Sequence, residues 1–187
     1  MTEVIRVTLV SHAMTDAMAA GRFPADEPLN RIGRRQAKAA GAIQRLEINS
    51  GMRQLAGPEE RARQTAQLLG LHATTEARLA DLGCGAWCGQ TLRAVGPADL
   101  EMWLTDPGRA PHGGESIVDL IERVAGWLAS LTHDALPTVA VTHPAVIRAA
   151  ILGALDMPPK SFWRIDIAPV SRTVLHFRKG NWTLRLC

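Results

Sequence analysis

Two histidines stand directly after short runs of apolar, β-branched residues. His12 follows residues 4–10 and Ser11, and His143 follows residues 138–142. Such runs are typical of buried strands, and ligands of open α/β sheets bind outside the carboxyl ends of the strands. If the two strands are neighbours, one imidazole can attack phosphorus through one ring nitrogen while a backbone carbonyl holds the other. The second imidazole can donate hydrogen bonds to the charge that builds on phosphoryl oxygens.

Arg61 could add a permanent positive charge to the same edge of the sheet. It follows an expected short strand over residues 52–56 and the turn Gly57-Pro58, in the first turn of an expected helix. Pro58 suits the first helical position. From there the guanidinium can reach back toward the strand ends and hold an oxyanion through two parallel hydrogen bonds. The three side chains together predict a site for a phosphoryl group or another small anion.

Strands and helices must alternate along most of the chain to position these residues. We expect a loop over residues 16–29 that runs over the mouth of the site, and then a helix that Asn30 caps. A short helix is expected over residues 97–104. Ser116 and Asp119 predict a capping box at the start of a longer amphipathic helix.

The last part of the chain changes character. Residues 173–178 and 182–186 alternate apolar and polar side chains around Lys179-Gly180-Asn181, which predicts an antiparallel hairpin. Strands alternating with helices and then a hairpin indicate an α/β fold, a three-layer α/β/α sandwich. Its central sheet would be mostly parallel with an antiparallel edge. The 187 residues, 47% of them hydrophobic, predict a single domain over residues 1–187.

The composition disfavours several classes of protein. The 21 basic and 18 acidic residues give a net charge of +3, with no basic tail and no tyrosine, so nucleic-acid binding is not indicated. The first residues lack the pattern of a signal peptide, and no apolar run approaches about 18 residues. We therefore expect a cytoplasmic protein without a membrane partner. Its mild positive charge is compatible with a small anionic metabolite as substrate.

The three cysteines, Cys84, Cys88 and Cys187, do not make a disulfide framework. A metal site at the first two would need a second pair of ligands, and their surroundings are rich in glycine instead. We expect reduced cysteines, no metal and no cofactor. The hairpin at the sheet edge, with Trp182, could pair with a second copy of the chain in a homodimer.

Several segments, in one order along the chain, resemble the motifs of the histidine phosphatase superfamily. This family includes the cofactor-dependent phosphoglycerate mutases and α-ribazole phosphatase. The resemblance spans nearly the whole chain, and the order and spacing of the motifs make it specific. The matching segments are Leu9-Val10-Ser11-His12-Ala13-Met14-Thr15, Pro28-Leu29-Asn30-Arg31-Ile32-Gly33-Arg34-Arg35-Gln36-Ala37, Pro58-Glu59-Glu60-Arg61-Ala62-Arg63-Gln64-Thr65-Ala66, Asp81 with Gly85-Ala86-Trp87-Cys88-Gly89, Gly113-Gly114-Glu115-Ser116, and Thr142-His143-Pro144-Ala145-Val146-Ile147-Arg148.

The resemblance implies a phosphoglycerate mutase-like fold and a set of catalytic roles. His12 would be the nucleophile that becomes phosphorylated, and Arg61 and His143 would bind the transferring phosphoryl group. Asp81 takes the place of the glutamate that protonates the leaving oxygen. Water would then release phosphate from the enzyme, and the family needs no metal for this reaction.

Four further residues are assigned to substrate and phosphate binding: Ser11, Thr15, Arg22 and Glu115. Thr15 belongs to the motif of the nucleophile. Glu115 matches a glutamate at the side of the family's pocket, and a structural role at the following helix start is equally compatible with its position.

Some positions depart from the family pattern, and one of them changes the charge beside the nucleophile. Losing a charge-assisted hydrogen bond to phosphate removes about 1.5–3 kcal/mol, so we expect weaker phosphate binding than in a typical member. Arg22 or Arg31 could supply the missing charge, or the pocket could be reshaped for another ligand. The departures are Ser11 for arginine, Ala13 for glycine, Met18 for asparagine and Cys88 for glutamate.

Our leading hypothesis is a phosphatase that acts on a small phosphorylated metabolite through a phosphohistidine, weakly or with unusual selectivity. Two alternatives stay open: a binding or regulatory module that keeps the fold without turnover, and non-phosphoryl chemistry in the same pocket. A mutase is less favoured, because the chain is short for the insertions that enclose a bisphosphate. Fold analogy does not decide between the first three hypotheses.

Overall fold

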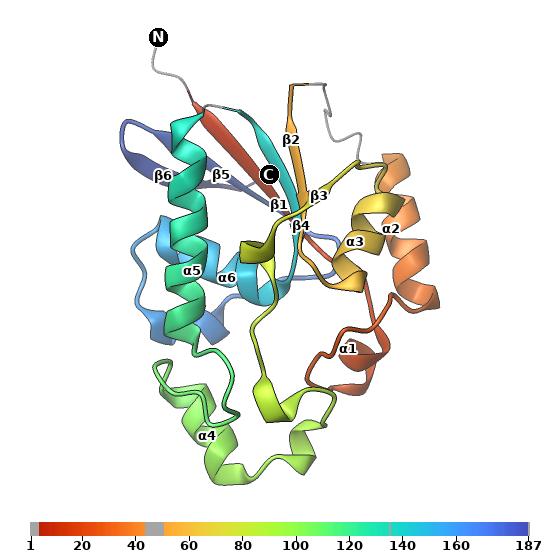
Figure 1. The fold of residues 1–187 in the computed structure, drawn as a ribbon, viewed down its shortest axis with the longest axis vertical. Helices are drawn as coiled ribbons and strands as arrows, with labels where there is room; N and C mark the ends of the chain where they lie inside the picture. Colours follow the sequence, from red (N-terminus) through yellow and green to blue (C-terminus); the bar gives the residue numbers. More distant parts are fainter. Residues whose placement is uncertain (1–3, 44–50, 135, 187) are drawn as a thin grey trace.

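One mixed sheet of six strands runs through the centre of the protein (Figure 1). The structure is a computed structural model and describes residues 4–43, 51–134 and 136–186. The strands lie in the order β3-β2-β4-β1-β5-β6; the first four are mutually parallel, and β5 and β6 form an antiparallel edge. This arrangement confirms the predicted α/β fold with an antiparallel hairpin at its edge.

The elements follow closely from the sequence pattern. The strands are β1 (Ile5–Ser11), β2 (Arg53–Ala56), β3 (Thr74–Thr75), β4 (Thr138–Thr142), β5 (Arg172–Arg178) and β6 (Asn181–Arg185). The α-helices are α1 (Asp16–Ala20), α2 (Arg31–Ile43), α3 (Glu60–Leu68), α4 (Pro97–Thr105), α5 (Ile117–Ser130) and α6 (Pro144–Ala154). Short 3₁₀ helices are η1 (Ala77–Leu79), η2 (Gly85–Trp87), η3 (Leu92–Ala94), η4 (Leu131–His133) and η5 (Pro159–Arg164).

Helices cover both faces of the sheet. Successive side chains of a strand point to opposite faces, so Val7 and Leu9 of β1 join the core beneath α5 and α6, whereas Val10 joins the core beneath α2 and α3. Figure 1 shows α5 and α6 on one side of the sheet and α2 and α3 on the other. A sheet buried on both faces explains why β1 and β4 are apolar runs without polar alternation.

The pairing of β1 with β4 brings the two histidines together. The strands are parallel neighbours, with Ser11 opposite Thr142, and each is followed at once by its histidine. The backbone N–H of His12 donates to the carbonyl of Thr142 across 2.8 Å, which extends the strand pairing by one residue. The expectation that the two histidine-bearing strands are neighbours is therefore confirmed.

Most of the predicted helix signals are confirmed. Asn30 Oδ1 accepts from the backbone N–H of Gly33 at the start of α2, at 2.8 Å. Ser116 and Asp119 form the capping box of α5. In the described residues, no helix has both the length and the apolar character needed to cross a membrane.

Two local predictions were wrong. Residues 16–29 are not all loop, because α1 occupies Asp16–Ala20; Thr15 Oγ1 caps it by accepting from the N–H of Met18 at 3.2 Å, and Gly21 ends it in the left-handed region. This helix is too short to show an apolar period, so only its caps could have indicated it. Pro58 is not the first helical residue either, since α3 begins at Glu60 with Glu59 as its N-cap.

Gly33 allows α2 to approach the loop that follows His12. A Cβ at this buried glycine would lie 2.1 Å from the carbonyl oxygen of Met14 and 2.8 Å from its nitrogen. These are backbone atoms, so they cannot rotate away as a side chain would. The requirement for glycine here comes from space rather than from backbone conformation.

We expect Gly33→Ala to lower the free energy of unfolding by about 1–3 kcal/mol, because the methyl group forces α2 away from its neighbour. Gly126→Ala is the matched control: Gly126 is exposed on α5, and nothing lies within 4 Å of the position that its methyl group would take. That change should raise stability by about 0.5–1 kcal/mol through helix propensity. Urea unfolding measures both, and equal effects of the two substitutions would contradict the close approach.

Candidate active site

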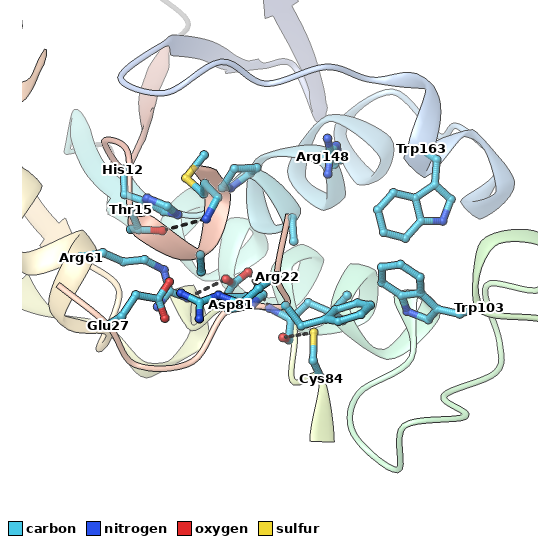
Figure 2. A pocket seen from close by; sticks show the side chains of 17 residues that line it. His12, Thr15, Arg22, Glu27, Arg61, Asp81, Cys84, Trp103, Arg148 and Trp163 are labelled. Atoms are coloured by element: carbon cyan, nitrogen blue, oxygen red, sulfur yellow. Dashed lines mark hydrogen bonds and ion pairs between the residues drawn. The ribbon is translucent and has the colours of Figure 1, made fainter. Parts of the chain in front are cut away.

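A cavity of about 190 Å³ opens where the carboxyl ends of the parallel strands meet the loops. His12, Arg61 and Asp81 line one part of it, and the rings of Trp103 and Trp163 line another (Figure 2). The catalytic candidates thus reach one cavity from β1, α3 and the loop after η1.

His12 is fixed in the form that a nucleophile needs. Its ring Nδ1 lies 2.8 Å from the carbonyl oxygen of Ala13. A carbonyl can only accept, so Nδ1 carries the proton and Nε2 keeps its lone pair. Burial, with a smaller contribution from the charge of His143, lowers the pKa of His12 to about 4. The imidazole is therefore neutral at pH 7.

His143 lies behind His12, with a carboxylate near each of its ring nitrogens. The side chain is fully buried and is not part of the cavity wall; its ring centroid is 5.2 Å from that of His12. Nε2 lies 2.6 Å from Glu59 Oε2, and Nδ1 lies 3.4 Å from Asp81 Oδ2. Nε2 is therefore hydrogen-bonded to a carboxylate, whereas Nδ1 faces Asp81 without a hydrogen bond among the described residues.

Arg61 is held from two sides. Its Nη2 donates to Asp81 Oδ2 at 2.7 Å, and its Nη1 donates to the carbonyl oxygen of Ala25 at 2.6 Å. Ala25 belongs to the segment after α1, residues 22–29. The same segment makes a second contact with α3, because Asp26 Oδ1 accepts from the N–H of Glu60 at 2.8 Å. These contacts fix a fully buried guanidinium beside the nucleophile.

Asp81 is ionised in this arrangement. Burial raises the pKa of Asp81, but the charges of His143, Arg61 and His12 and the hydrogen bond from Arg61 outweigh burial, so the pKa is lowered. The carboxylate also accepts from the N–H of Leu82 at 2.9 Å. A residue expected to protonate the leaving oxygen therefore carries no proton in the free site and must acquire one when substrate binds.

Glu115 does not line the cavity and instead supports the backbone that carries Asp81. Its two oxygens accept from Nη2 and Nε of Arg123, each at 2.7 Å. Arg123 in turn donates to the carbonyl oxygens of Arg78, Ala80 and Asp81. Of the two roles compatible with the sequence, these contacts favour the structural one.

The other predicted residues lie at the cavity wall, in the interior or on the surface. Thr15, Met18 and Arg22 line the cavity, Arg22 with an exposed side chain. Ser11 is fully buried outside the wall, and its hydroxyl points to the carbonyl of His12 at 3.5 Å. Arg31 is exposed on α2 and does not reach the wall.

The cysteines that the structure describes are free thiols. Cys84 is buried at the cavity wall, and burial is the main reason that its pKa rises to about 12, so it remains a protonated thiol. Cys88 is exposed and lies away from the cavity. Cys187 lies outside the described residues.

Sequence reasoning missed Glu59 and Arg148. The charge of Glu59 is favourable at the start of a helix, and this was the only role that the sequence indicated. In the structure, its Oε2 contacts His143, and its Oε1 accepts from the N–H of Asp81 at 2.9 Å. Arg148 lines the cavity from α6, five residues after His143. Its place within the second histidine motif could have indicated that Arg148 belongs to the site.

The model of the histidine phosphatase superfamily, branch 1, matches residues 7–187. The chain belongs to this superfamily. The match covers almost all of the sequence, including the regions of both histidines, Arg61 and Asp81. The resemblance seen in the motifs alone is thereby confirmed.

Among its relatives in the superfamily is glucosyl-3-phosphoglycerate phosphatase of Mycobacterium tuberculosis, 30% identical over 172 residues, which are 82% of this chain and 76% of that protein. A structure of the mycobacterial enzyme with VO3 has a TM-score of 0.84 at 28% identity and covers 97% of this chain and 98% of the other. Phosphoserine phosphatase of Entamoeba histolytica, at 22% identity, shares the fold with a TM-score of 0.86 over 96% and 94% of the two chains. Other mycobacterial relatives are longer, and this chain spans 50% of their length.

We expect Glu59→Gln to lower the free energy of unfolding at pH 7 by about 1–3 kcal/mol, because it removes a charged partner of the buried His143. Burial raises the pKa of Glu59, but the hydrogen bond and charge of His143 outweigh it and hold the pKa below its usual 4.5. The stabilisation is therefore present above pH 4.5 and is lost as the pH falls through the folded-state pKa.

Urea unfolding at pH 7 and in acid, beside Glu60→Gln as control, measures this effect. Among the described residues, the side chain of Glu60 has one hydrogen-bond partner, Gln64 on the same helix, so its substitution should change stability by less than about 0.5 kcal/mol. A loss in Glu59→Gln that does not shrink in acid would contradict the pairing with His143.

We expect the imidazole of His12 to remain neutral down to about pH 4 in the folded protein. Because the folded state binds fewer protons here than the unfolded chain, this site costs stability as the pH falls from the usual 6.5 toward 4. NMR of the ring nitrogens during a pH titration reports the protonation directly. Protonation of His12 near pH 6.5 would show that burial does not determine the pKa of this side chain.

Proposed function

We propose that this protein is a phosphomonoesterase that transfers a phosphoryl group from a small phosphorylated metabolite to His12 and then to water. The observation that carries the proposal is the state of His12. A buried, neutral imidazole with its proton held at Nδ1 presents a basic nitrogen beside the guanidinium of Arg61. The names of the relatives, which are phosphatases of glucosyl-3-phosphoglycerate and phosphoserine, support the same reaction class.

In the first step, Nε2 of His12 attacks phosphorus as the bond from phosphorus to the ester oxygen breaks. Arg61 stabilises the charge on the phosphoryl oxygens, and its contact with the Ala25 carbonyl must yield to them. The second pKa of a phosphate monoester is about 6, so the substrate can bring a proton as its monoanion. Asp81 takes this proton and passes it to the leaving oxygen, which departs as an alcohol.

In the second step, water attacks the phosphohistidine and the bond from Nε2 to phosphorus breaks. Asp81, now ionised again, accepts a proton of the water and passes it to the phosphate, which leaves as its monoanion with His12 and Asp81 restored. His143, held by Glu59, lies behind His12 and can donate a hydrogen bond toward negative charge on the phosphoryl group. The sum of the steps is one ester and one water converted to one alcohol and one phosphate.

We expect His12→Ala to lower phosphomonoesterase activity by at least about a thousandfold, because no other group can form the covalent intermediate. His133→Ala, a change at an exposed histidine of η4 that is not part of the cavity wall, is the control and should retain activity. A panel of phosphomonoesters measured by phosphate release provides the assay. Quenching turnover with denaturant at alkaline pH should trap an acid-labile phosphoryl group on the protein, and mass spectrometry should place it on His12.

Full activity in His12→Ala would refute the mechanism. A natural chain that binds phosphomonoesters but hydrolyses none of them would instead favour a binding module that has kept the fold.

A further inference from the structure

Asp81 needs a source for the proton that it gives to the leaving oxygen. It is ionised in the free site, where its Oδ2 accepts from Arg61 Nη2 at 2.7 Å and its Oδ1 accepts from the N–H of Leu82 at 2.9 Å. A guanidinium keeps its protons in a protein, and a backbone amide is a far weaker acid than a carboxylic acid. Within the described residues, the remaining polar contact of this carboxylate is with His143, whose Nδ1 lies 3.4 Å from Oδ2.

Glu59 fixes a proton on the other ring nitrogen of His143. Its Oε2 lies 2.6 Å from Nε2, and an ionised carboxylate can only accept, so Nε2 donates. Nδ1 is therefore the nitrogen that gains or loses a proton. It is buried, has no hydrogen-bond partner in the described part of the chain, and faces Asp81.

Glu59 also sets the distance between His143 and Asp81. Its Oε1 accepts from the N–H of Asp81 at 2.9 Å, so one carboxylate holds both the imidazole and the backbone that carries Asp81. Gly57 leaves the space for this contact. A Cβ there would lie 2.9 Å from His143 Nε2 and 3.2 Å from Glu59 Oε2, as well as 2.7 Å from the carbonyl oxygen of Leu79. The turn between β2 and α3 is thus shaped to accommodate the Glu59–His143 pair.

The charges around His143 favour a proton on its ring. Within the described residues, the titratable and charged groups of this cluster are Glu59 and Arg61 from the start of α3, Asp81 from the loop after η1, and His12 from the end of β1. Two of them are negative, one is positive, and His12 is neutral. Nearby opposite charges favour the charged form of a group and offset the cost of its burial.

We propose that His143 stores, on Nδ1, the proton that Asp81 gives to the leaving oxygen, and that Glu59 is the positioning residue of this proton store. A phosphoryl group that draws Arg61 away from Asp81 raises the affinity of Asp81 for a proton. The proton then moves from Nδ1 to Oδ2 and on to the ester oxygen as its bond to phosphorus breaks. This inference rests on the proposed function for the reaction.

The proton store allows the substrate to react as its dianion. In the second step, the proton that Asp81 takes from water returns to Nδ1 of His143 instead of leaving with the product. One ester dianion and one water become one alcohol and one monohydrogen phosphate dianion, and every side chain regains its starting state. A monoanionic substrate brings its own proton and does not need the store.

The kinetic test compares glycerol 1-phosphate, whose alkoxide must be protonated as it leaves, with p-nitrophenyl phosphate, whose phenolate leaves without a proton. Glu59→Gln keeps an acceptor for Nε2 but removes the charge. At about pH 8 we expect this variant to lower kcat/KM by about 10- to 100-fold for glycerol 1-phosphate and by less than about threefold for p-nitrophenyl phosphate. The loss should shrink below about pH 6, where the substrate is a monoanion.

Glu60→Gln removes the same charge one residue along the chain, and it should leave both substrates and the pH profile unchanged. An equal loss on the two substrates at every pH would show that Glu59 only supports the structure of the site. Unchanged kinetics in Glu59→Gln would also overturn the proposal.

Nitrogen-15 NMR of His143 tests the store without turnover, and the natural chain alone suffices if Glu59→Gln fails to fold. We expect both ring nitrogens to carry protons at pH 7. In Glu59→Gln, Nδ1 should lose its proton at a pH at least about one unit lower. An Nδ1 without a proton at pH 7 in the natural chain overturns the store. If Nδ1 is protonated and depends on Glu59 but no ester is hydrolysed, the proposed function fails and the Glu59–His143 pair stands.

Discussion

The parallel pairing of β1 with β4 is the constraint on which the rest of the site depends. It sets Ser11 opposite Thr142, so the residues that follow emerge at one level of the sheet and their imidazoles meet. Both strands are buried on both faces, and a slip of one residue would turn every side chain to the opposite face. The register of the core therefore also fixes the distance between His12 and His143.

Around this pair, the charges form a chain rather than a set of independent contacts. Glu59 contacts His143, His143 lies near Asp81, and Asp81 is paired with Arg61. Each buried charge is compensated by the next, which offsets the large cost of removing them from water. A phosphoryl group that enters the cavity competes for Arg61, so it alters the partner of Asp81 and can raise the affinity of that carboxylate for a proton.

The sequence predicted those parts of the site whose chemistry is local and whose position follows from the strands. His12 and His143 end apolar runs, and the capping box of α5 is a pattern of adjacent residues. It could not predict long-range partners: Glu59 meets His143 across 84 positions and Arg123 meets the carbonyl of Asp81 across 42. Such contacts depend on how the loops after β2 and η1 fold over the strand ends, and no period or cap encodes that path.

Weaker phosphate binding was expected because Ser11 stands at the position of an arginine in the motif that the sequence resembles. Ser11 is fully buried outside the wall, so this position now contributes no charge to a ligand. The arginines that line the wall are Arg22, Arg61 and Arg148. Arg61 lies beside His12, while Arg148 lies further along α6 beside the rings of Phe162 and Trp163. Positive charge is thus distributed along the cavity wall from Arg61 to Arg148. In the proposed reaction, such a distribution lets contacts with the leaving group supply part of the binding energy. Selectivity among phosphate esters then increases while the affinity for phosphate itself decreases.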